Sequence, residues 1–227
     1  MAEDVVSRVK RTMRALARAV ASQVNKPLAT RRLRQYRRAH QPPYRVQVGS
    51  GLVQRPGWLN TDIGPAARFW LDIGAPLPFP DHSVEYLFSE HVIEHVDPAV
   101  VARFLREAYR VLAPGGVIRT LTPDPEGLAR EYLARSDLAR AVVQRGAAAG
   151  YRSRYPVDLL NVVFYENGHC YLWDEESLTA ALREAGFQRI TRQQYGVSPH
   201  PELAAMDGHL KPDDPAIPFV LVLEATR

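Results

Sequence analysis

Short apolar runs that alternate with helical patterns constrain this chain most strongly. The runs that predict strands are Arg45–Val48, Trp58–Thr61, Phe69–Leu71, Val84–Ser89, Val117–Leu121, Arg189–Gln194 and Phe219–Ala225. The central runs are continuously apolar, as strands buried on both faces are. Strands that alternate with helices indicate an α/β fold, in which a mostly parallel sheet is covered by helices on both faces.

Helix signals are clearest in the second half of the chain. Asp97 is placed to cap a helix that has Pro98 at its first position. Its apolar stripe comprises Val101, Phe104, Leu105, Ala108, Val111 and Leu112. A second helical stretch covers roughly Glu126–Gln144, and Asp174 caps a third helix that Gly186 stops.

A basic arm, residues 1–43, precedes the predicted domain at 44–227. Apolar residues recur at helical spacing between Asp4 and Val24, and Pro27 is expected to end this helix. The stripe comprises Val5, Val9, Met13, Leu16, Val20 and Val24, with Arg8, Lys10, Arg11, Arg14 and Arg18 at other positions. A second basic stretch, Arg31–His40, leads to the stiff boundary Pro42-Pro43.

Positive charge is concentrated in this arm. Residues 1–46 hold 12 of the 29 Lys and Arg residues and two of the 25 acidic ones, which leaves 17 basic against 23 acidic residues elsewhere. Three interpretations of the arm compete: a helix on an anionic membrane surface, a grip for an acidic partner or nucleic acid, and a helix packed on the domain. The acidic balance of the body argues against nucleic acid as the substrate.

The compartment is predicted from cysteine use and hydropathy. The single cysteine, Cys170, cannot form an internal disulfide, which fits a reducing compartment. No apolar run reaches membrane-spanning length, and the N-terminus lacks the apolar core of a signal peptide. We therefore expect a cytoplasmic protein that contacts membranes, if at all, through the N-terminal helix.

The glycine loop Gly49-Ser50-Gly51 follows the first predicted strand. Glycines there let a backbone approach a ligand closely, although a tight turn explains them equally well. A dinucleotide fingerprint would need glycine at position 54, which is Gln54. Asp62 ends the second strand, where a carboxylate accepts both hydroxyls of a ribose or simply caps a turn.

Further segments make the pattern more specific. In order, they are the glycine loop, Asp62, Asp72, "PLPFPDHSVEYLFSE", "EAYRVLAPGGVIRTLTPD" and "FVLVLEATR". This order resembles the class I S-adenosylmethionine-dependent methyltransferases, most closely the type 11-like subgroup, over about Tyr44 to Arg227. The resemblance implies a Rossmann-like fold of seven-strand type and S-adenosylmethionine as the cofactor.

The resemblance also implies cofactor contacts in the first half of the domain. Gly49, Ser50 and Gly51 would lie against the methionine part of the cofactor. Asp62 would hold the ribose hydroxyls, and Ile63 would lie beside the adenine.

Two further pairs of residues complete the implied cofactor site. Asp72 would meet the adenine amino group, and Ile73 would stack near the ring. Ser89 and Glu90, after the fourth strand, would line the cofactor and lead toward the reacting methyl group.

The sequence departs from the family pattern in three places. Gln47 stands where an acidic residue is common, and Leu52-Val53 replaces a small residue of the loop. A parallel crossover normally needs a dozen residues or more. The connections after the first two strands are shorter than this, so the helices expected there are absent or a single turn. We therefore predict that the N-terminal helix covers the exposed sheet surface.

Histidines are the candidates for a base that takes a proton from the methyl acceptor. His91 follows the fourth strand and is the first candidate, whereas Glu94 and His95 are expected to anchor the next helix. His169 lies in a polar insert near 147–173 that would cover the substrate, and it is the second candidate. These four residues also suit a metal, but nothing in the sequence fixes their distance, and we assign no metal.

The sequence thus predicts a methyltransferase that acts on a hydroxyl of a sugar, a glycan or another polar small molecule. Two alternatives stay open: methylation of nitrogen or carbon on a small metabolite, and a cofactor-binding scaffold without turnover. The acceptor, the oligomeric state and a metal requirement are not fixed by the sequence.

Overall fold

The computed structural model describes residues 2–166, 168–204, 206–211 and 213–227, and within the first helix the side chains of Met13, Leu16, Ala17 and of residues 19 onward. Its centre is one sheet with the strand order β3-β2-β1-β4-β5-β7-β6. The strands are β1 (Tyr44–Val48), β2 (Leu59–Asp62), β3 (Phe69–Trp70), β4 (Val84–Glu90), β5 (Leu112–Pro123), β6 (Arg189–Arg192) and β7 (Val220–Thr226). The pairs from β3 to β5 are parallel, and β7 runs antiparallel to β5 and β6.

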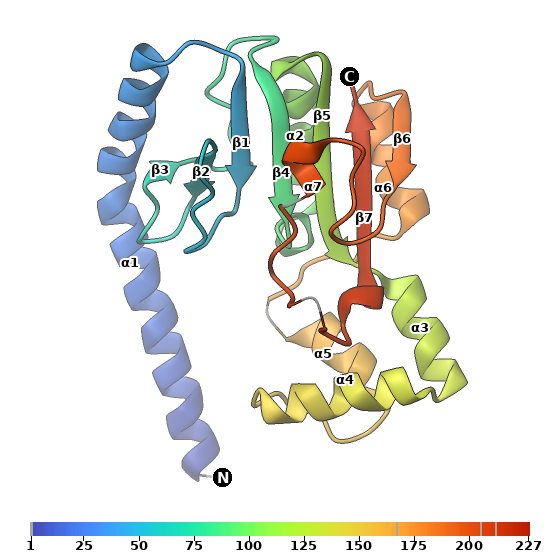
Figure 1. Cartoon of the computed structure of the whole chain (residues 1–227). Helices are drawn as coiled ribbons and strands as arrows, with labels where there is room; N and C mark the ends of the chain where they lie inside the picture. The colour runs from blue at the N-terminus through green and yellow to red at the C-terminus, as the bar shows by residue number, and fades with distance from the viewer. Residues whose placement is uncertain (1, 167, 205, 212) are drawn as a thin grey trace.

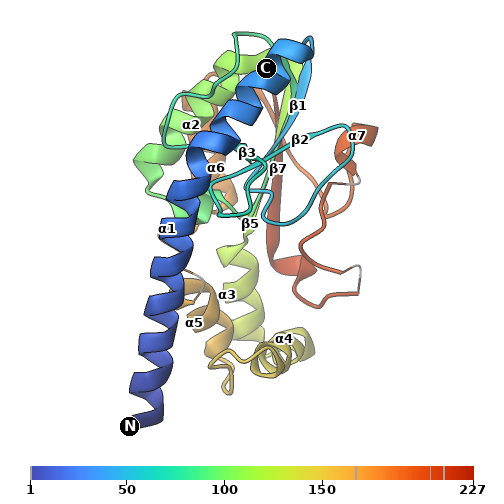
Figure 2. The ribbon, with the colours of Figure 1, turned by 90° about the vertical axis from the view of Figure 1, so that its left-hand side faces the viewer.

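Helices flank the sheet as Figures 1 and 2 show. They are α1 (Ala2–Ala39), α2 (Pro98–Val111), α3 (Pro125–Ala134), α4 (Asp137–Ala148), α5 (Asp158–Tyr165), α6 (Glu175–Glu184) and α7 (Pro201–Ala204), with 3₁₀ turns η1 (Ile93–His95) and η2 (Ile217–Phe219). In Figure 2, α2 and α6 lie on one side of the sheet and α7 lies on the other. No helix in the described part of the chain is both long enough and apolar enough to cross a membrane.

The main core lies between the sheet and the pair α2 and α6. Every residue of the predicted α2 stripe is fully buried there, and Asp97 caps the helix by accepting a hydrogen bond from the Ala99 amide at 2.8 Å. Burial of this stripe stabilises the helix far more than its intrinsic propensity does. The predicted cap at Asp174 is likewise confirmed, because its carboxylate accepts from the Ser177 amide at 2.8 Å.

The expected absence of helices after β1 and β2 is confirmed, since residues 49–68 contain none. The N-terminal helix packs beside this region, but two details of its prediction were wrong. Pro27 lies inside α1 and does not end it. The proline removes one backbone hydrogen bond, yet the helix continues because the turns after it pack on β3.

The packed part of α1 is also not the predicted stripe. Ala29 and Leu33 are buried, and the Tyr36 ring meets Phe69 of β3 edge-on at 5.5 Å. Asn25 donates a hydrogen bond to the Ala67 carbonyl at 2.8 Å. Met13, Leu16, Val20 and Val24 are exposed instead, whereas the Val5 and Val9 side chains lie outside the described residues.

The two stripes lie on opposite sides of α1. Val20 precedes Ala29, and Val24 precedes Leu33, by about two and a half helical turns. The face that continues the predicted stripe therefore points away from β3. Figure 1 shows the N-terminal half of α1 extending past the sheet edge.

One further helix prediction needed correction, and the insert contains a helix for which no prediction was made. The stretch Glu126–Gln144 is two helices, because Arg135 adopts a left-handed conformation with φ 52° and Ser136 starts α4 by accepting from the Ala139 amide at 3.0 Å. The insert near 147–173 contains α5, and Asp158 at its first position holds the turn that precedes the helix. Its carboxylate accepts from the amides of Arg154 and Tyr155 at 2.7 and 2.8 Å.

Arg119 of β5 fastens the segment between β6 and β7 to the sheet. Its guanidinium is fully buried, and it donates to Glu224 of β7 at 2.7 Å and to Asp207 at 2.8 Å. Removing one partner of such a buried pair costs about 3–5 kcal/mol, because the remaining charge stays in the interior. Arg119 thus fixes Asp207, which lies between β6 and β7, against the sheet.

Candidate functional site

A cavity of about 850 Å³ opens at the carboxyl ends of β1, β4 and β5. Its sheet side is formed by residues 49–53, by Glu90 and His91, and by Pro123. Its other wall comes from α3, α4, α5 and the segment before β7. Open α/β sheets bind ligands at this end of the strands, and we refer to this space as the carboxyl-end cavity.

The glycine loop forms one edge of the cavity, and its conformation requires glycine. Gly49 and Gly51 have φ values of 67° and 55°, which L residues with side chains rarely adopt. A Cβ on Gly49 would lie 2.3 Å from Val92 Cγ2. A Cβ on Gly51 would meet nothing within 4 Å, so that side of the loop is open to a ligand.

Asp62 is held directly beside this loop. Its Oδ2 accepts from the Gly51 amide at 2.8 Å, and its Oδ1 accepts from the Gly64 amide at 2.5 Å. The structure thus joins the loop and the carboxylate that the sequence singled out separately. Asp62 is bonded to the loop but is not one of the residues that line the cavity.

Two buried polar atoms near the loop lack a partner in the described part of the chain. Gln47 Oε1 belongs to a residue that lines the cavity, and Ser89 Oγ lies at the end of β4. A buried polar atom without a hydrogen bond costs about 1–3 kcal/mol. Gln47 therefore offers an acceptor to a ligand donor, such as the ammonium group of an amino acid.

The predicted adenine contacts lie outside the cavity. Ile63 is exposed, and Asp72 is exposed with its Oδ1 accepting from the Gly74 amide at 2.8 Å. Ile73 packs in the main core. Their roles toward an adenine, like those of the glycine loop toward the cofactor, stay predictions.

Glu90 lines the cavity, but its carboxylate is already engaged. It accepts from the amide of His209 at 3.0 Å and from that of Gly208 at 3.2 Å. The Tyr195 hydroxyl donates to it at 3.3 Å, and burial raises the pKa of Tyr195 to about 12, so the phenol stays protonated. Glu90 therefore joins Tyr195, Gly208 and His209 to the end of β4.

His91 and Glu94 form a hydrogen-bonded dyad at the end of β4. His91 Nδ1 lies 2.9 Å from Glu94 Oε1, and the Glu94 side chain is fully buried. With the proton on Nδ1, Nε2 carries a lone pair, and this buried nitrogen has no partner among the described residues. The His91 backbone has φ 52°, a strained conformation of the kind found at functional sites.

His95 and His169 meet at the other side of Glu94. Their ring centroids are 4.8 Å apart, although the two residues lie far apart in the sequence. His169 Nδ1 lies 2.6 Å from the Val163 carbonyl, and burial lowers the pKa of His169. Glu94 and His95 thus take part in this cluster, and the expectation that they merely anchor the next helix was incomplete.

His209 is a site residue that sequence reasoning missed. Its ring lies 4.8 Å from the His91 ring, and burial lowers its pKa so that it is neutral at neutral pH. It follows β6 in an irregular segment, and no motif signals its position. Asn167, which precedes Gly168-His169 in the predicted substrate insert, lies outside the described residues.

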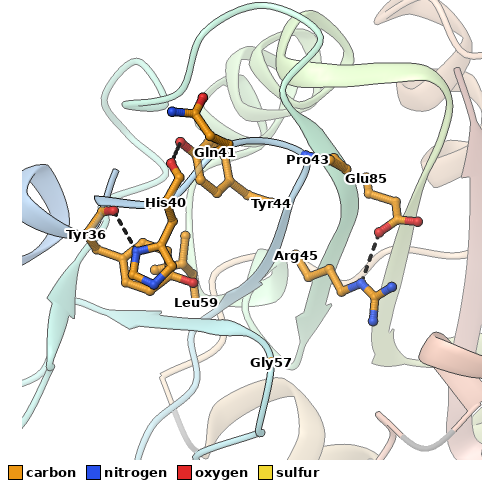
Figure 3. Close-up of a pocket in the computed structure, with 9 residues that line it drawn as sticks. All are labelled: Tyr36, His40, Gln41, Pro43, Tyr44, Arg45, Gly57, Leu59 and Glu85. Atoms are coloured by element: carbon orange, nitrogen blue, oxygen red, sulfur yellow. Dashed lines mark hydrogen bonds and ion pairs between the residues drawn. The ribbon is translucent and has the colours of Figure 1, made fainter. Parts of the chain in front are cut away.

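A second cavity, of about 360 Å³, lies between the end of α1 and the amino end of β1 (Figure 3). Its polar groups are engaged with one another. Tyr44 donates to the His40 carbonyl at 2.9 Å, and Arg45 pairs with Glu85 at 3.0 Å. It lies at the opposite end of β1 from the glycine loop, and none of its described lining residues has a buried side-chain polar atom without a partner.

Comparisons with known proteins find methyltransferases among the similar sequences and structures. A family model described as a methyltransferase domain matches residues 63–120. A probable S-adenosylmethionine-dependent methyltransferase of Mycolicibacterium smegmatis is 46% identical over 50 residues. That match covers 22% of this chain and 19% of the relative, so it spans about a fifth of either protein.

Solved structures with similar chains include two methyltransferases. One is a S-adenosylmethionine-dependent methyltransferase of Thermotoga maritima, described as a possible histamine N-methyltransferase. It is 18% identical to this chain, and the match covers 99% of this chain and 97% of the Thermotoga chain with a TM-score of 0.45. A S-adenosylmethionine-dependent methyltransferase of Archaeoglobus fulgidus is 16% identical and covers 89% and 94%, with a TM-score of 0.47.

The seven-stranded sheet with an antiparallel β7 has the architecture that the resemblance implied. The matched methyltransferase domain and the short match to a S-adenosylmethionine-dependent methyltransferase agree with the predicted class I family over the parts of the chain that they cover. S-adenosylmethionine is the cofactor that the resemblance implies, and the carboxyl-end cavity can be compared with it. The open glycine loop, the orphaned Gln47 oxygen and the adjacent Asp62 carboxylate suit its methionine and ribose parts.

Proposed function

We propose that this protein transfers a methyl group from S-adenosylmethionine to a hydroxyl of a polar small molecule, of which a sugar or glycan is the first candidate. One observation carries the proposal. The glycine loop and the His91–Glu94 dyad line or adjoin a single cavity at the carboxyl ends of the strands. A cofactor-binding edge and a base for the acceptor are thus available to the same ligand space.

Each part of the chain would have a separate task. Gly49 to Gly51, Gln47 and Asp62 would hold the cofactor, which when bound supplies an electrophilic methyl group on a sulfonium. The chain then has to orient the acceptor and remove its proton, because the electrophile is already activated. His91 Nε2 would accept that proton, and Glu94 would keep the other ring nitrogen protonated and stabilise the imidazolium.

Cofactor binding is the first test of this proposal. Calorimetry with S-adenosylhomocysteine should give one site, and Asp62→Ala should weaken binding at least tenfold, since it removes a carboxylate beside the loop. Asp81→Ala is the matched control, because Asp81 is an exposed carboxylate paired with Arg110 away from the cavity. A wild-type protein that does not bind the cofactor product would overturn the proposal.

Turnover tests the base and the acceptor class. Transfer of labelled methyl groups to sugars, amines and carbon acids should favour hydroxylated acceptors. His91→Ala should lower kcat about 10²–10⁴-fold with unchanged S-adenosylhomocysteine affinity. Full activity in His91→Ala would remove His91 from this role, and turnover confined to amines would favour nitrogen methylation instead.

We also propose that the N-terminal half of α1, residues 2–24, binds an anionic membrane surface. Met13, Leu16, Val20 and Val24 are 57–75% exposed, and they belong to an arm with 12 basic and two acidic residues among its first 46. An exposed apolar stripe within a basic helix matches anionic lipid in both hydrophobicity and charge. The test is sedimentation with vesicles that contain or lack phosphatidylglycerol, in low and high salt.

The expected result is binding to the anionic vesicles alone, weakened by salt. Equal binding to neutral vesicles, or none to either, would overturn the membrane proposal. If vesicles are not bound and light scattering reports a dimer that Leu16→Asp dissociates, the stripe is an interface between two copies of the chain.

A further inference from the structure

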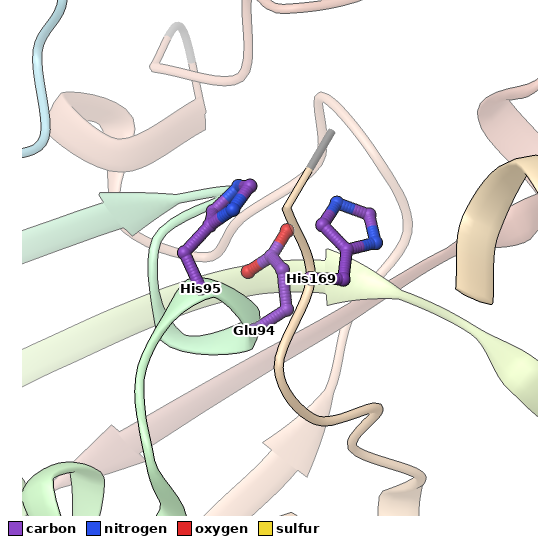
Figure 4. Close-up of side chains that lie close together, drawn as sticks. All are labelled: Glu94, His95 and His169. Carbon is purple, nitrogen blue, oxygen red and sulfur yellow. The ribbon is translucent and has the colours of Figure 1, made fainter. Parts of the chain in front are cut away.

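Three side chains beside the carboxyl-end cavity have the composition of a transition-metal site. Glu94 and His95 come from the turn η1 after β4, and His169 comes from the segment between α5 and α6. One ligand atom of each lies within 4.8 Å of the other two. Figure 4 shows the carboxylate and the two imidazoles gathered from these two segments.

The unpaired oxygen of Glu94 is an independent sign that this cluster lacks a ligand. Glu94 is fully buried, and its Oε1 accepts from His91, but Oε2 has no hydrogen-bond partner among the described residues. A buried carboxylate oxygen without a donor is costly. A cation held between Oε2 and the two imidazoles would satisfy it.

His169 has the hydrogen bond that metal-binding histidines usually have. Its Nδ1 donates to the Val163 carbonyl at 2.6 Å, which leaves the lone pair on Nε2. Such an outer bond fixes the tautomer and the orientation of a ligand ring. His169 is therefore prepared to offer Nε2 to a cation.

The backbone holds the two ligand-bearing segments together. The amides of Cys170 and Tyr171 both donate to the Glu94 carbonyl, at 2.7 and 3.2 Å. These backbone hydrogen bonds hold the segment that carries His169 against the turn that carries Glu94. Ligand atoms around a tetrahedral zinc ion lie about 3.3 Å apart, so rotations that move these atoms by about 1 Å would close the site.

We propose that Glu94, His95 and His169 bind a divalent first-row transition metal, with Zn²⁺ as the first candidate. Two imidazoles and one carboxylate favour Zn²⁺ or its neighbours over Mg²⁺ and Ca²⁺, which prefer oxygen ligands. Three protein ligands leave coordination positions free, as in catalytic rather than structural zinc sites. His95 and His169 line the cavity, so these positions face its interior.

One consequence rests on the proposed function. A metal at this place would coordinate the acceptor hydroxyl and lower its pKa, so that His91 removes the proton more easily. Glu94 would then link the two groups, with Oε1 on His91 and Oε2 on the metal. Metal binding itself does not depend on methyl transfer.

The test uses the untagged full-length chain, stripped with a chelator and titrated with Zn²⁺ or Co²⁺ alone. Calorimetry should give one equivalent of metal, and bound Co²⁺ should show the visible absorption of a low-coordinate site. Glu94→Gln, His95→Ala and His169→Ala should each weaken binding at least tenfold. His40→Ala is the matched control, because His40 is exposed and stacks on Tyr36 at the far end of β1.

Circular dichroism would verify that each variant folds, and Glu94→Gln retains the shape of the side chain if an alanine variant does not. A wild-type chain that binds no metal, or folded His95→Ala and His169→Ala variants that bind like wild type, would overturn the proposal. S-adenosylhomocysteine binding to the metal-free chain separates the two hypotheses. If the metal-free chain does not bind S-adenosylhomocysteine, the proposed function is overturned. If it binds S-adenosylhomocysteine but the chain binds no metal, only the metal site is overturned.

Discussion

The two halves of α1 have the same helical backbone but opposite relations to the rest of the molecule. Leu33, in the second half, is 2% exposed and belongs to the main core, whereas Leu16, in the first half, is 60% exposed. The second half replaces a helix that the shortened crossovers do not provide, whereas in the first half nearly all the described side chains are exposed. Amphipathic spacing alone therefore does not identify which part of a helix packs on its own domain.

The largest difference in stability between the two halves of α1 should come from truncation. Deleting residues 1–40 should destabilise the protein by about 5 kcal/mol, because Leu33, Tyr36 and Phe69 lose their packing. Deleting residues 1–24 should change the free energy of unfolding by less than about 1 kcal/mol. Urea unfolding of both truncated chains measures this, and equal losses would mean that the two halves contribute alike.

The same substitution in each half gives a sharper comparison. Leu33→Ala should cost about 2–4 kcal/mol, since it removes buried methyl groups and leaves a cavity under the helix. Leu16→Ala should stay within about 0.5 kcal/mol. Chemical denaturation of the two variants measures this. If Leu33→Ala unfolded at the wild-type midpoint, the packing of Leu33 in the main core would be contradicted.

A reciprocal result is expected on vesicles. Leu16→Ser with Val20→Ser should reduce partitioning onto phosphatidylglycerol vesicles at least tenfold, because two apolar side chains no longer enter the interface. Leu33→Ala serves as the control, with its folded fraction measured first, and should partition like wild type. Unchanged partitioning of the double variant would remove the exposed stripe from membrane binding.

The smallest expected effect concerns one hydrogen bond. Asn25→Ala should cost about 1 kcal/mol, because it removes the bond from Asn25 to the Ala67 carbonyl. Gln23→Ala changes an exposed amide two residues earlier and should be neutral within the error of thermal unfolding. A neutral Asn25→Ala would show that the packing of α1 on β3 rests on apolar contacts alone.

Local patterns predicted much of this fold. The seven strands and α2 were predictable because their apolar residues follow strand or helix periods that the buried faces of the sheet enforce. The continuation of α1 past Pro27 was not, since it depends on the contact of Leu33 with a sheet that is distant in the sequence. The break at Arg135 was missed, although Ser136-Asp137 is a readable start of a helix.

The residues of the candidate site also divide into those that local sequence patterns identified and those that only the fold brings together. Gly49, Gly51, Asp62 and His91 could be identified because each follows a predicted strand, and the carboxyl ends of parallel strands share one edge. The cluster of His95 with His169 could not, because it requires the backbone bonds that join Cys170 and Tyr171 to Glu94. His209 had no local signal at all.

The buried Arg119 has a consequence for the chain during its synthesis. Its partner Glu224 lies 105 residues further along the chain, which a ribosome needs about 5–20 s to make. In that interval β4 and β5 can pair, but one edge of β5 stays open and the guanidinium lacks one of its two carboxylate partners. The nascent protein is therefore most exposed to misassociation just before β7 emerges, and chaperone contact would be most valuable at that point.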